Sequence, residues 1–141
     1  MSKILVSYFS ASGVTKRKAE ALAKEVNGDL YEIIPKQVYT NEDLNWNNSN
    51  SRTSIEIKNK NLRPEIENIS IDINSYETIY IGFPIWWGIA PNIIKTFIDN
   101  IDLSNKKIIT FCTSGGSSLS PATKDLQETY PQALIENGRR L

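Results

Sequence analysis

The feature that most constrains this chain is an apolar strand that ends in a small hydroxyl-rich loop and leads straight into a helix. Residues 4–9 are apolar enough for a buried strand, and residues 16–26 carry apolar side chains at helical spacing. The loop between them, residues 10–15, reads Ser-Ala-Ser-Gly-Val-Thr. The first turn of a helix exposes free backbone N–H groups and a partial positive charge. This arrangement predicts a phosphate-binding loop.

The residues of this loop suit that function, although they also allow a simpler interpretation. Ser10, Ser12 and Thr15 offer hydroxyl donors, and Gly13 lets the backbone approach a ligand closely. The sequence contains neither the G-x-x-x-x-G-K-[ST] motif of nucleoside triphosphate sites nor a G-x-G-x-x-G dinucleotide motif after this strand. Alternatively, Ser12 serves only as an N-cap of the following helix. The loop by itself does not decide between the two.

Length and composition exclude several classes of protein. The 141 residues suffice for one domain, expected to span residues 1–141. The formal net charge is +0, which gives no support for nucleic-acid binding. With Cys112 as the one cysteine and no histidine, neither a disulfide framework nor a Cys/His metal site is expected. No apolar run is long enough for a membrane span, and no signal peptide precedes the first strand, so a cytoplasmic location is expected.

Strand and helix patterns alternate along the chain. The near-continuous apolar strands predict burial on both faces, as in a doubly wound α/β fold with a parallel sheet. Further strands are expected at 29–34, 78–83, 107–112 and 132–135, and further helices at 91–101 and 121–130.

The segment 36–77 is too long for a plain loop. It is rich in Asn and Ser, and we expect short helices at 41–46 and 52–58 within it. Several of its apolar side chains need burial, which favours an excursion packed beside the sheet over a linker; they are Leu44, Trp46, Ile55, Ile57 and Leu62.

Two more unusual loops follow predicted strands. Residues 84–91 carry two adjacent tryptophans, and residues 113–118 form a Gly-Gly turn rich in hydroxyls. Ligands of open parallel sheets bind at the carboxyl ends of the strands, where all three loops are expected to lie. A flat aromatic ligand bearing a phosphate would use all three. Either tryptophan could instead be core packing, and the Gly-Gly run could be only a turn.

Together, these three loops resemble those of the flavodoxin family, specifically its short bacterial FMN-binding members. Residues 10–15 match the family's [ST]-x-[ST]-G-x-T phosphate loop. Residues 83–88, with Ala90 and Pro91, resemble its second flavin loop, and residues 113–117 resemble its third. Residues 43–46 and 51–52 also look like a segment of this group. The resemblance implies a five-stranded sheet of order 2-1-3-4-5 with FMN at its carboxyl edge. The cofactor-binding residues it implies are Ser10, Ala11, Ser12, Gly13, Val14, Thr15, Pro84, Ile85, Trp86, Trp87, Gly88, Thr113, Ser114, Gly115, Gly116 and Ser117.

The chain departs from the family pattern in two respects. It stops after the predicted fifth strand, where a flavodoxin continues into a closing helix. We therefore expect apolar side chains on an uncovered sheet face, and either a homodimer or a shortened chain. The neutral net charge also weakens electrostatic steering toward a basic redox partner.

The leading functional hypothesis is FMN-dependent electron transfer to a redox protein partner. The alternative is an FMN-dependent oxidoreductase acting on NAD(P)H or a quinone, which the neutral charge and the short length slightly favour. A third hypothesis is a regulatory or binding module without flavin. No amino-acid side chain is assigned a catalytic role, because the isoalloxazine ring itself supplies the redox chemistry.

Overall fold

A five-stranded parallel sheet of order β2-β1-β3-β4-β5 forms the centre of the computed structural model. The structure describes residues 3–11, 13–45, 47–59, 61–86, 88–102, 106–113 and 119–140. The strands are β1 (Ile4–Tyr8), β2 (Asp29–Glu32), β3 (Thr78–Pro84), β4 (Lys107–Thr113) and β5 (Leu134–Arg140). The helices are α1 (Val14–Val26), α2 (Arg52–Lys58), α3 (Asn92–Asp99) and α4 (Ser120–Thr129), with a short 3-10 helix at Ile73–Ser75. The predicted doubly wound α/β fold and strand order are confirmed.

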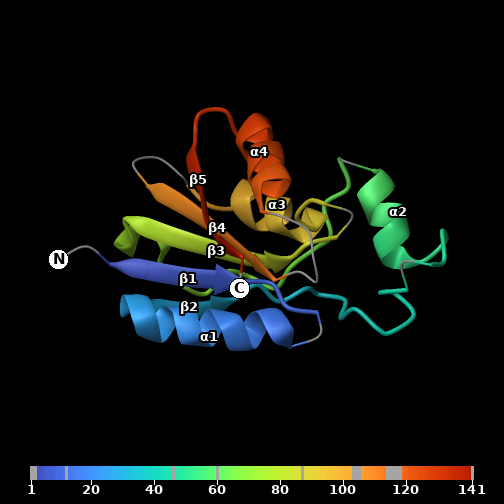
Figure 1. Cartoon of the computed structure of the whole chain (residues 1–141), viewed down its shortest axis with the longest axis horizontal. Helices are drawn as coiled ribbons and strands as arrows, with labels where there is room; N and C mark the ends of the chain where they lie inside the picture. Colours follow the sequence, from blue (N-terminus) through green and yellow to red (C-terminus); the bar gives the residue numbers. More distant parts are fainter. Residues whose placement is uncertain are drawn as a thin grey trace.

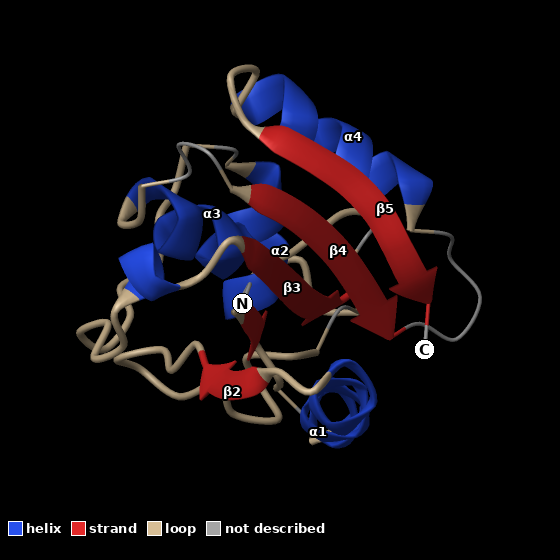
Figure 2. Ribbon diagram, turned by 90° about the vertical axis from the view of Figure 1, so that its left-hand side faces the viewer, coloured by secondary structure: helices blue, strands red, loops and turns tan. Residues whose placement is uncertain are grey.

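Helices cover both faces of the sheet. Figures 1 and 2 show α1 on one face and α3 with α4 on the other. Helix α3 is almost entirely buried, with Ile94 and Phe97 fully inaccessible to solvent, because its apolar residues recur at helical spacing. On the opposite face, Ala19 and Leu22 of α1 pack against the sheet, as their spacing predicts. The core is therefore two layers of side chains, one on each side of the sheet.

The face that carries α1 contains a close backbone-to-ring contact. The Phe111 ring of β4 lies over Gly82 of β3, where a Cβ atom would come within 2.0 Å of the ring. Phe111 is completely buried and belongs to the same cluster as α1. The glycine thus makes room for an aromatic side chain between α1 and the sheet.

Beyond α1, the same face carries both apolar and charged side chains. Tyr80 and Ile109 are partly buried there, and the side chain of Leu134 is 61% exposed. The expected apolar side chains are present, but the ammonium of Lys107 and the carboxylate of Glu136 form an ion pair of 3.0 Å among them. This part of the face is therefore mixed in polarity, not wholly apolar.

The prediction for the last strand is wrong in its extent. We expected a strand at 132–135, whereas β5 runs from Leu134 to Arg140. Its second half is Glu-Asn-Gly-Arg-Arg, which lacks the apolar pattern of a buried strand. β5 lies at the edge of the sheet and is held by backbone pairing with β4, whose register shifts beside Thr110. Such a strand forms without apolar side chains along its whole length.

The expected helix at 41–46 is also wrong. Residues 41–44 form turns, and Trp46 lies outside the described residues. The Thr40 amide donates to the Asp43 carboxylate at 3.0 Å, and the Asp43 amide donates to the Thr40 hydroxyl at 3.1 Å. The side chain of Asn45 accepts from the amide of Asn47 at 3.1 Å. These local bonds compete with helical ones and close a single turn.

The second helix of the excursion forms where predicted, but with a different buried face. Helix α2 lies beyond the carboxyl ends of β1 and β3 in Figure 1. Its buried residues are Thr53, Ser54 and Glu56, while Ile55 is 49% exposed. The expected burial of Leu44, Ile57 and Leu62 is only partial. This helix therefore packs through its polar face, because its contacts include Tyr39 and Asn92, which lie beside the loops.

Candidate functional site

The loops after β1, β3 and β4 meet at one edge of the sheet. The hydroxyls of Thr15 and Thr113 lie 2.8 Å apart and link the first loop and its helix to the start of the third. The amide of Ile85 donates to the carbonyl of Thr113 at 3.2 Å, which links the second loop to the third. The rings of Phe9 and Trp86, with centroids 5.7 Å apart, link the first to the second. The predicted convergence of the three loops is thereby present among the described residues.

The first loop leaves the N-terminus of α1 open. The N-cap is Gly13, in the left-handed region with φ 92°, and no side chain caps the helix. The structure assigns the N-cap to Gly13, whereas Ser12, the N-cap of the alternative interpretation, lies outside the described residues. The Ser10 hydroxyl instead accepts from the Gly13 amide at 3.0 Å. The amides of the first turn remain available to an anion.

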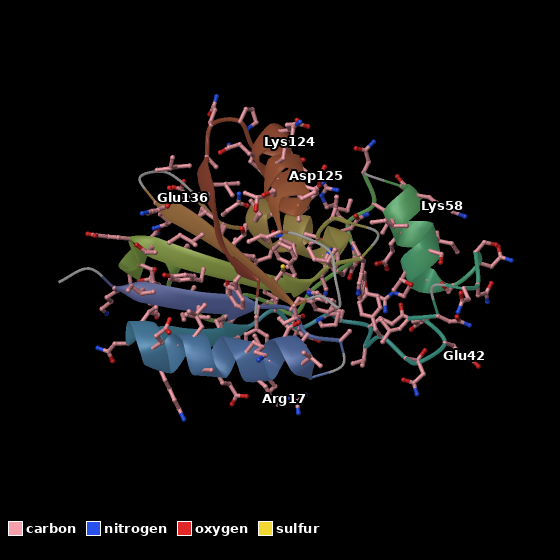
Figure 3. The ribbon with its side chains drawn as sticks, viewed as in Figure 1. Arg17, Glu42, Lys58, Lys124, Asp125 and Glu136 are labelled. Carbon is pink, nitrogen blue, oxygen red and sulfur yellow. The ribbon has the colours of Figure 1, made fainter. Side chains whose placement is uncertain are left out.

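The basic side chains that follow the first loop do not form this anion site. Lys16, Arg17 and Lys18 are exposed on α1, and Figure 3 shows Arg17 extending away from the sheet. None of the residues in 10–15, 84–91 and 113–118 is ionisable. Only backbone amides, hydroxyls and the helix dipole are therefore offered to a phosphate by the loops.

The second loop contains a tight turn with an aromatic side chain at its start. The amide of Trp86 donates to the carbonyl of Ile89 at 2.9 Å, and the amide of Ile89 donates to the carbonyl of Trp86 at 3.1 Å. Gly88 has φ 83°, and a Cβ there would meet nothing within 4 Å, as is also true of Gly13. Both glycines thus hold conformations that other residues rarely adopt and face open space. A ligand can approach the backbone closely at these two positions.

Trp86 is partly buried and attached to the core. Its ring meets those of Phe9 and Tyr39 edge to face, with centroid distances of 5.7 and 5.5 Å. Among the described residues, it is therefore the aromatic side chain that the second loop places beside the converging loops. Several site residues of the sequence prediction lie outside the described residues: Ser12, Trp87, Ser114, Gly115, Gly116 and Ser117.

The sequence interpretation missed a cluster beside this loop. Tyr39 is 7% exposed and donates its hydroxyl to the Glu56 carboxylate at 2.6 Å, while Arg52 lies over its ring. Burial, followed by the Glu56 hydrogen bond, raises the pKa of Tyr39, so the phenol remains a donor. The spacing of Arg52 and Glu56 at i and i+4 on a helix was the available signal.

The opposite edge of the sheet carries an open groove of about 1330 Å³, lined by Tyr76, Asp99 and Tyr130 among others. The Asp99 carboxylate accepts from Tyr130 at 2.6 Å and from Arg63 at 2.8 Å. These groups satisfy one another, and the groove lies at the amino ends of the strands, far from the three loops.

In the described part of the chain, no cluster of Cys, Asp or Glu could hold a metal ion, and no helix is long and apolar enough to cross a membrane.

The geometry fits a ligand that combines an anion with a flat ring. The N-terminus of α1, a helix of 13 residues, offers backbone amides to an anion, and the turn that begins at Trp86 lies at the same edge of the sheet. Hydroxyls and amides orient such a ligand, but the loops contain no group for proton transfer.

Comparison with known proteins agrees with this description. A protein-family model described as flavodoxin matches residues 3–141. A candidate flavoprotein from Bacteroides eggerthii DSM 20697 has the same structure with a TM-score of 0.98 and 48% sequence identity, over 100% of this chain and 89% of that one. A flavoprotein in complex with FMN from Lactobacillus acidophilus NCFM has a TM-score of 0.82 and 26% identity, over 99% of this chain and 93% of that one.

A curated relative is more distant. The uncharacterized NAD(P)H oxidoreductase YcaK of Escherichia coli strain K12 is 27% identical over 92 residues, which is 64% of this chain. The matched part is 42% of that protein, less than half of its length.

Proposed function

Because this chain belongs to the flavodoxin family, we propose that it binds FMN at the carboxyl edge of its sheet and transfers electrons through it. The observation that carries the proposal is the convergence of three loops, linked by the Thr15–Thr113 hydroxyl contact of 2.8 Å. The solved relative from Lactobacillus acidophilus, which contains FMN, supports this choice of ligand.

The residues present fit FMN. The phosphate is assigned to the amides of the first turn of α1 and to the hydroxyls of Ser10 and Thr15. If Thr113 donates to Thr15, the Thr15 proton is free for a phosphate oxygen. The flavin ring is assigned to the space bordered by Trp86 and Gly88. FMN, when bound, supplies both one-electron and two-electron chemistry.

The remaining residues assigned to the site complete these two groups. Ala11, Ser12, Gly13 and Val14 belong to the phosphate loop, and Pro84, Ile85 and Trp87 to the ring loop. Residues 113–117 are assigned to the polar edge of the ring through their amides and hydroxyls. The whole of residues 1–141 is proposed to act as one domain, and the cytoplasmic location stays a prediction from the sequence.

Two functions compete for this site. An electron carrier uses a redox protein partner, whereas an oxidoreductase accepts electrons from NAD(P)H or passes them to a quinone. The similarity to a protein named as an NAD(P)H oxidoreductase favours the second. The formal net charge of +0 favours it too, because it provides little steering toward a charged partner protein.

An anaerobic titration separates these functions. The protein is loaded with FMN, freed of excess cofactor and reduced with dithionite or with NADPH while its absorption is recorded. Reduction in two resolved one-electron steps, with no response to NADPH, supports the electron carrier. Direct bleaching by NADPH supports the oxidoreductase. A protein that retains no yellow cofactor after incubation with FMN would contradict the proposed function as a whole.

A further inference from the structure

A buried tyrosine outside the three loops touches two of them. The Tyr39 ring meets Phe9 and Trp86 edge to face, with both centroid distances at 5.5 Å and interplanar angles of 62° and 68°. Phe9 and Trp86 also meet each other at 5.7 Å and 89°. Since Phe9 follows β1 and Trp86 begins the turn of the second loop, Tyr39 joins the two loops through aromatic contacts.

Helix α2 holds this tyrosine from the other side. The Tyr39 hydroxyl donates to Glu56 Oε1 at 2.6 Å, and the Arg52 guanidinium lies 3.7 Å from the centre of its ring. Arg52 Nε also donates to Glu56 Oε2 at 2.9 Å, and its Nη1 donates to the carbonyl of Gln37 at 2.7 Å. The ring of Tyr39 is thus held at its hydroxyl by Glu56 and on its face by Arg52, in addition to its two aromatic contacts.

A second connection joins α2 to the end of the second loop. The side-chain amide of Asn92, the first residue of α3, donates to the carbonyls of Glu56 at 2.8 Å and Asn59 at 2.9 Å. Asn92 is 4% exposed and follows directly after residues 84–91. Helix α2 is therefore connected to both ends of the second loop, to Trp86 indirectly through Tyr39 and to Asn92, which follows the loop, directly.

Helix α2 buries a charged side chain and exposes an apolar one. Its carboxylate at Glu56 is 6% exposed while its neighbour Ile55 is 49% exposed. Burying a charged group is costly unless it is paired and hydrogen-bonded, and here Glu56 pairs with the partly buried Arg52 and accepts from Tyr39. These two bonds give Tyr39 a defined orientation.

We propose that Tyr39 is a positioning residue of the flavin site, held by Arg52 and Glu56 so that it fixes Trp86 and the 86–89 turn in the conformation that receives the ring. The proposal rests on the proposed binding of FMN. Fixing a surface loop before the ligand arrives lowers the entropy that binding must overcome. The excursion 36–77 then has a function at the site, although no ligand contact is assigned to it.

The test uses two tyrosines in matched environments. Tyr39→Phe removes the hydroxyl that binds Glu56 and retains the ring. Tyr76→Phe is the control, because Tyr76 is 6% exposed and its hydroxyl donates to Asp29 at 2.7 Å, with Tyr76 bordering the groove at the opposite edge. We expect Tyr39→Phe to weaken binding of FMN and of riboflavin by the same factor, about tenfold, because the ring and not the phosphate is affected. Tyr76→Phe leaves both affinities unchanged.

Hydrogen exchange in the apoprotein tests the positioning directly. The amides of Trp86 and Ile89 bond to each other's carbonyls, so their exchange rates report whether the turn is held. Tyr39→Phe should accelerate both, and Tyr76→Phe neither. If Tyr39→Phe does not fold, Glu56→Ala and Glu56→Gln take its place. Glu56→Ala should weaken flavin binding, whereas Glu56→Gln should retain much of the affinity, because its amide oxygen can still accept from the Tyr39 hydroxyl.

Each outcome decides the proposal. Faster exchange in the turn together with weaker ring binding supports it. Unchanged affinity, or weaker affinity without faster exchange, overturns it. If the parent protein binds no flavin, the proposed function fails on that measurement, and the exchange rates still show whether Tyr39 holds the turn.

Discussion

The buried hydroxyl of Thr15 offers a sharp test of the phosphate loop. Thr15→Val preserves the shape of the side chain and removes the hydroxyl that faces Thr113 at 2.8 Å. The chain contains a matched control, Thr123, on α4, whose hydroxyl lies 2.8 Å from that of Thr110 on the same strand β4. Thr15 and Thr123 are 2% and 6% exposed, so both substitutions act on buried helix-to-strand pairs.

The two substitutions should have similar effects on folding. Leaving a buried hydroxyl without its partner costs roughly 1–3 kcal/mol of unfolding free energy. At the usual unfolding entropy of a chain of this length, that corresponds to roughly 3–10 °C in the melting temperature of the apoprotein. Thermal unfolding followed by circular dichroism measures this loss for Thr15→Val and Thr123→Val alike.

Only Thr15→Val, and not Thr123→Val, should weaken the binding of FMN. A hydrogen bond to a charged phosphate contributes roughly 1.5–3 kcal/mol, so FMN affinity of Thr15→Val should fall about tenfold or more. Riboflavin, which has no phosphate, should bind the variant and the parent equally well. Titration followed by tryptophan fluorescence gives both constants. Equal FMN affinities for Thr15→Val and Thr123→Val, or an equal loss for riboflavin, would refute the assignment of the phosphate to this loop.

Three further predictions concern the backbone and the pH dependence of stability. Gly82→Ala should destabilise the protein by roughly 1–3 kcal/mol in urea unfolding, because its Cβ would lie 2.0 Å from the Phe111 ring; an unchanged midpoint would contradict this packing. Gly88→Ala should lower the free energy of unfolding by about 1–2 kcal/mol, because Gly88 has φ 83°, and Gly88→Asn should lower it less; equal losses for the two variants would argue against a left-handed conformation at this position. Burial, followed by Glu32, raises the pKa of Tyr8 from 10.0 to about 12, so its contribution to stability is complete below pH 10 and is lost as the pH rises toward 12. Tyr8→Phe should make the fall in stability over that range shallower, and an unchanged slope would exclude this contribution.

The sheet and the edge at which its loops meet could be predicted from the sequence because their signals are local. A buried strand is a short apolar run, and α1 and α3 repeat their apolar residues at helical spacing, so both appear within a dozen residues. Glycines at 13 and 88, which hold positive φ values, likewise stand out in the loops. The loops carry the family resemblance, and that resemblance implied the strand order that the structure confirms.

The excursion and the last strand could not be predicted in this way. Helix α2 buries Glu56 and exposes Ile55, because its partner is the tyrosine beside a loop and not an apolar sheet face. The second half of β5 has no apolar pattern, since an edge strand is held by backbone bonds to β4. In both cases the deciding partner is far away in the sequence.

The sequence by itself therefore determined the first four strands, the helices that cover the sheet and which three loops follow the strands, but not the turns at 41–44 or the extent of β5. The tertiary structure decided what those loops contact. Thr15 and Thr113 are 98 residues apart in the chain, and Tyr39 reaches Glu56 and Trp86 from a segment without regular structure. Periodicity reports whether a residue faces the core, but it does not name the residue on the other side. That identity arises only when the parallel strands align their carboxyl ends and bring distant hydroxyls and rings within contact.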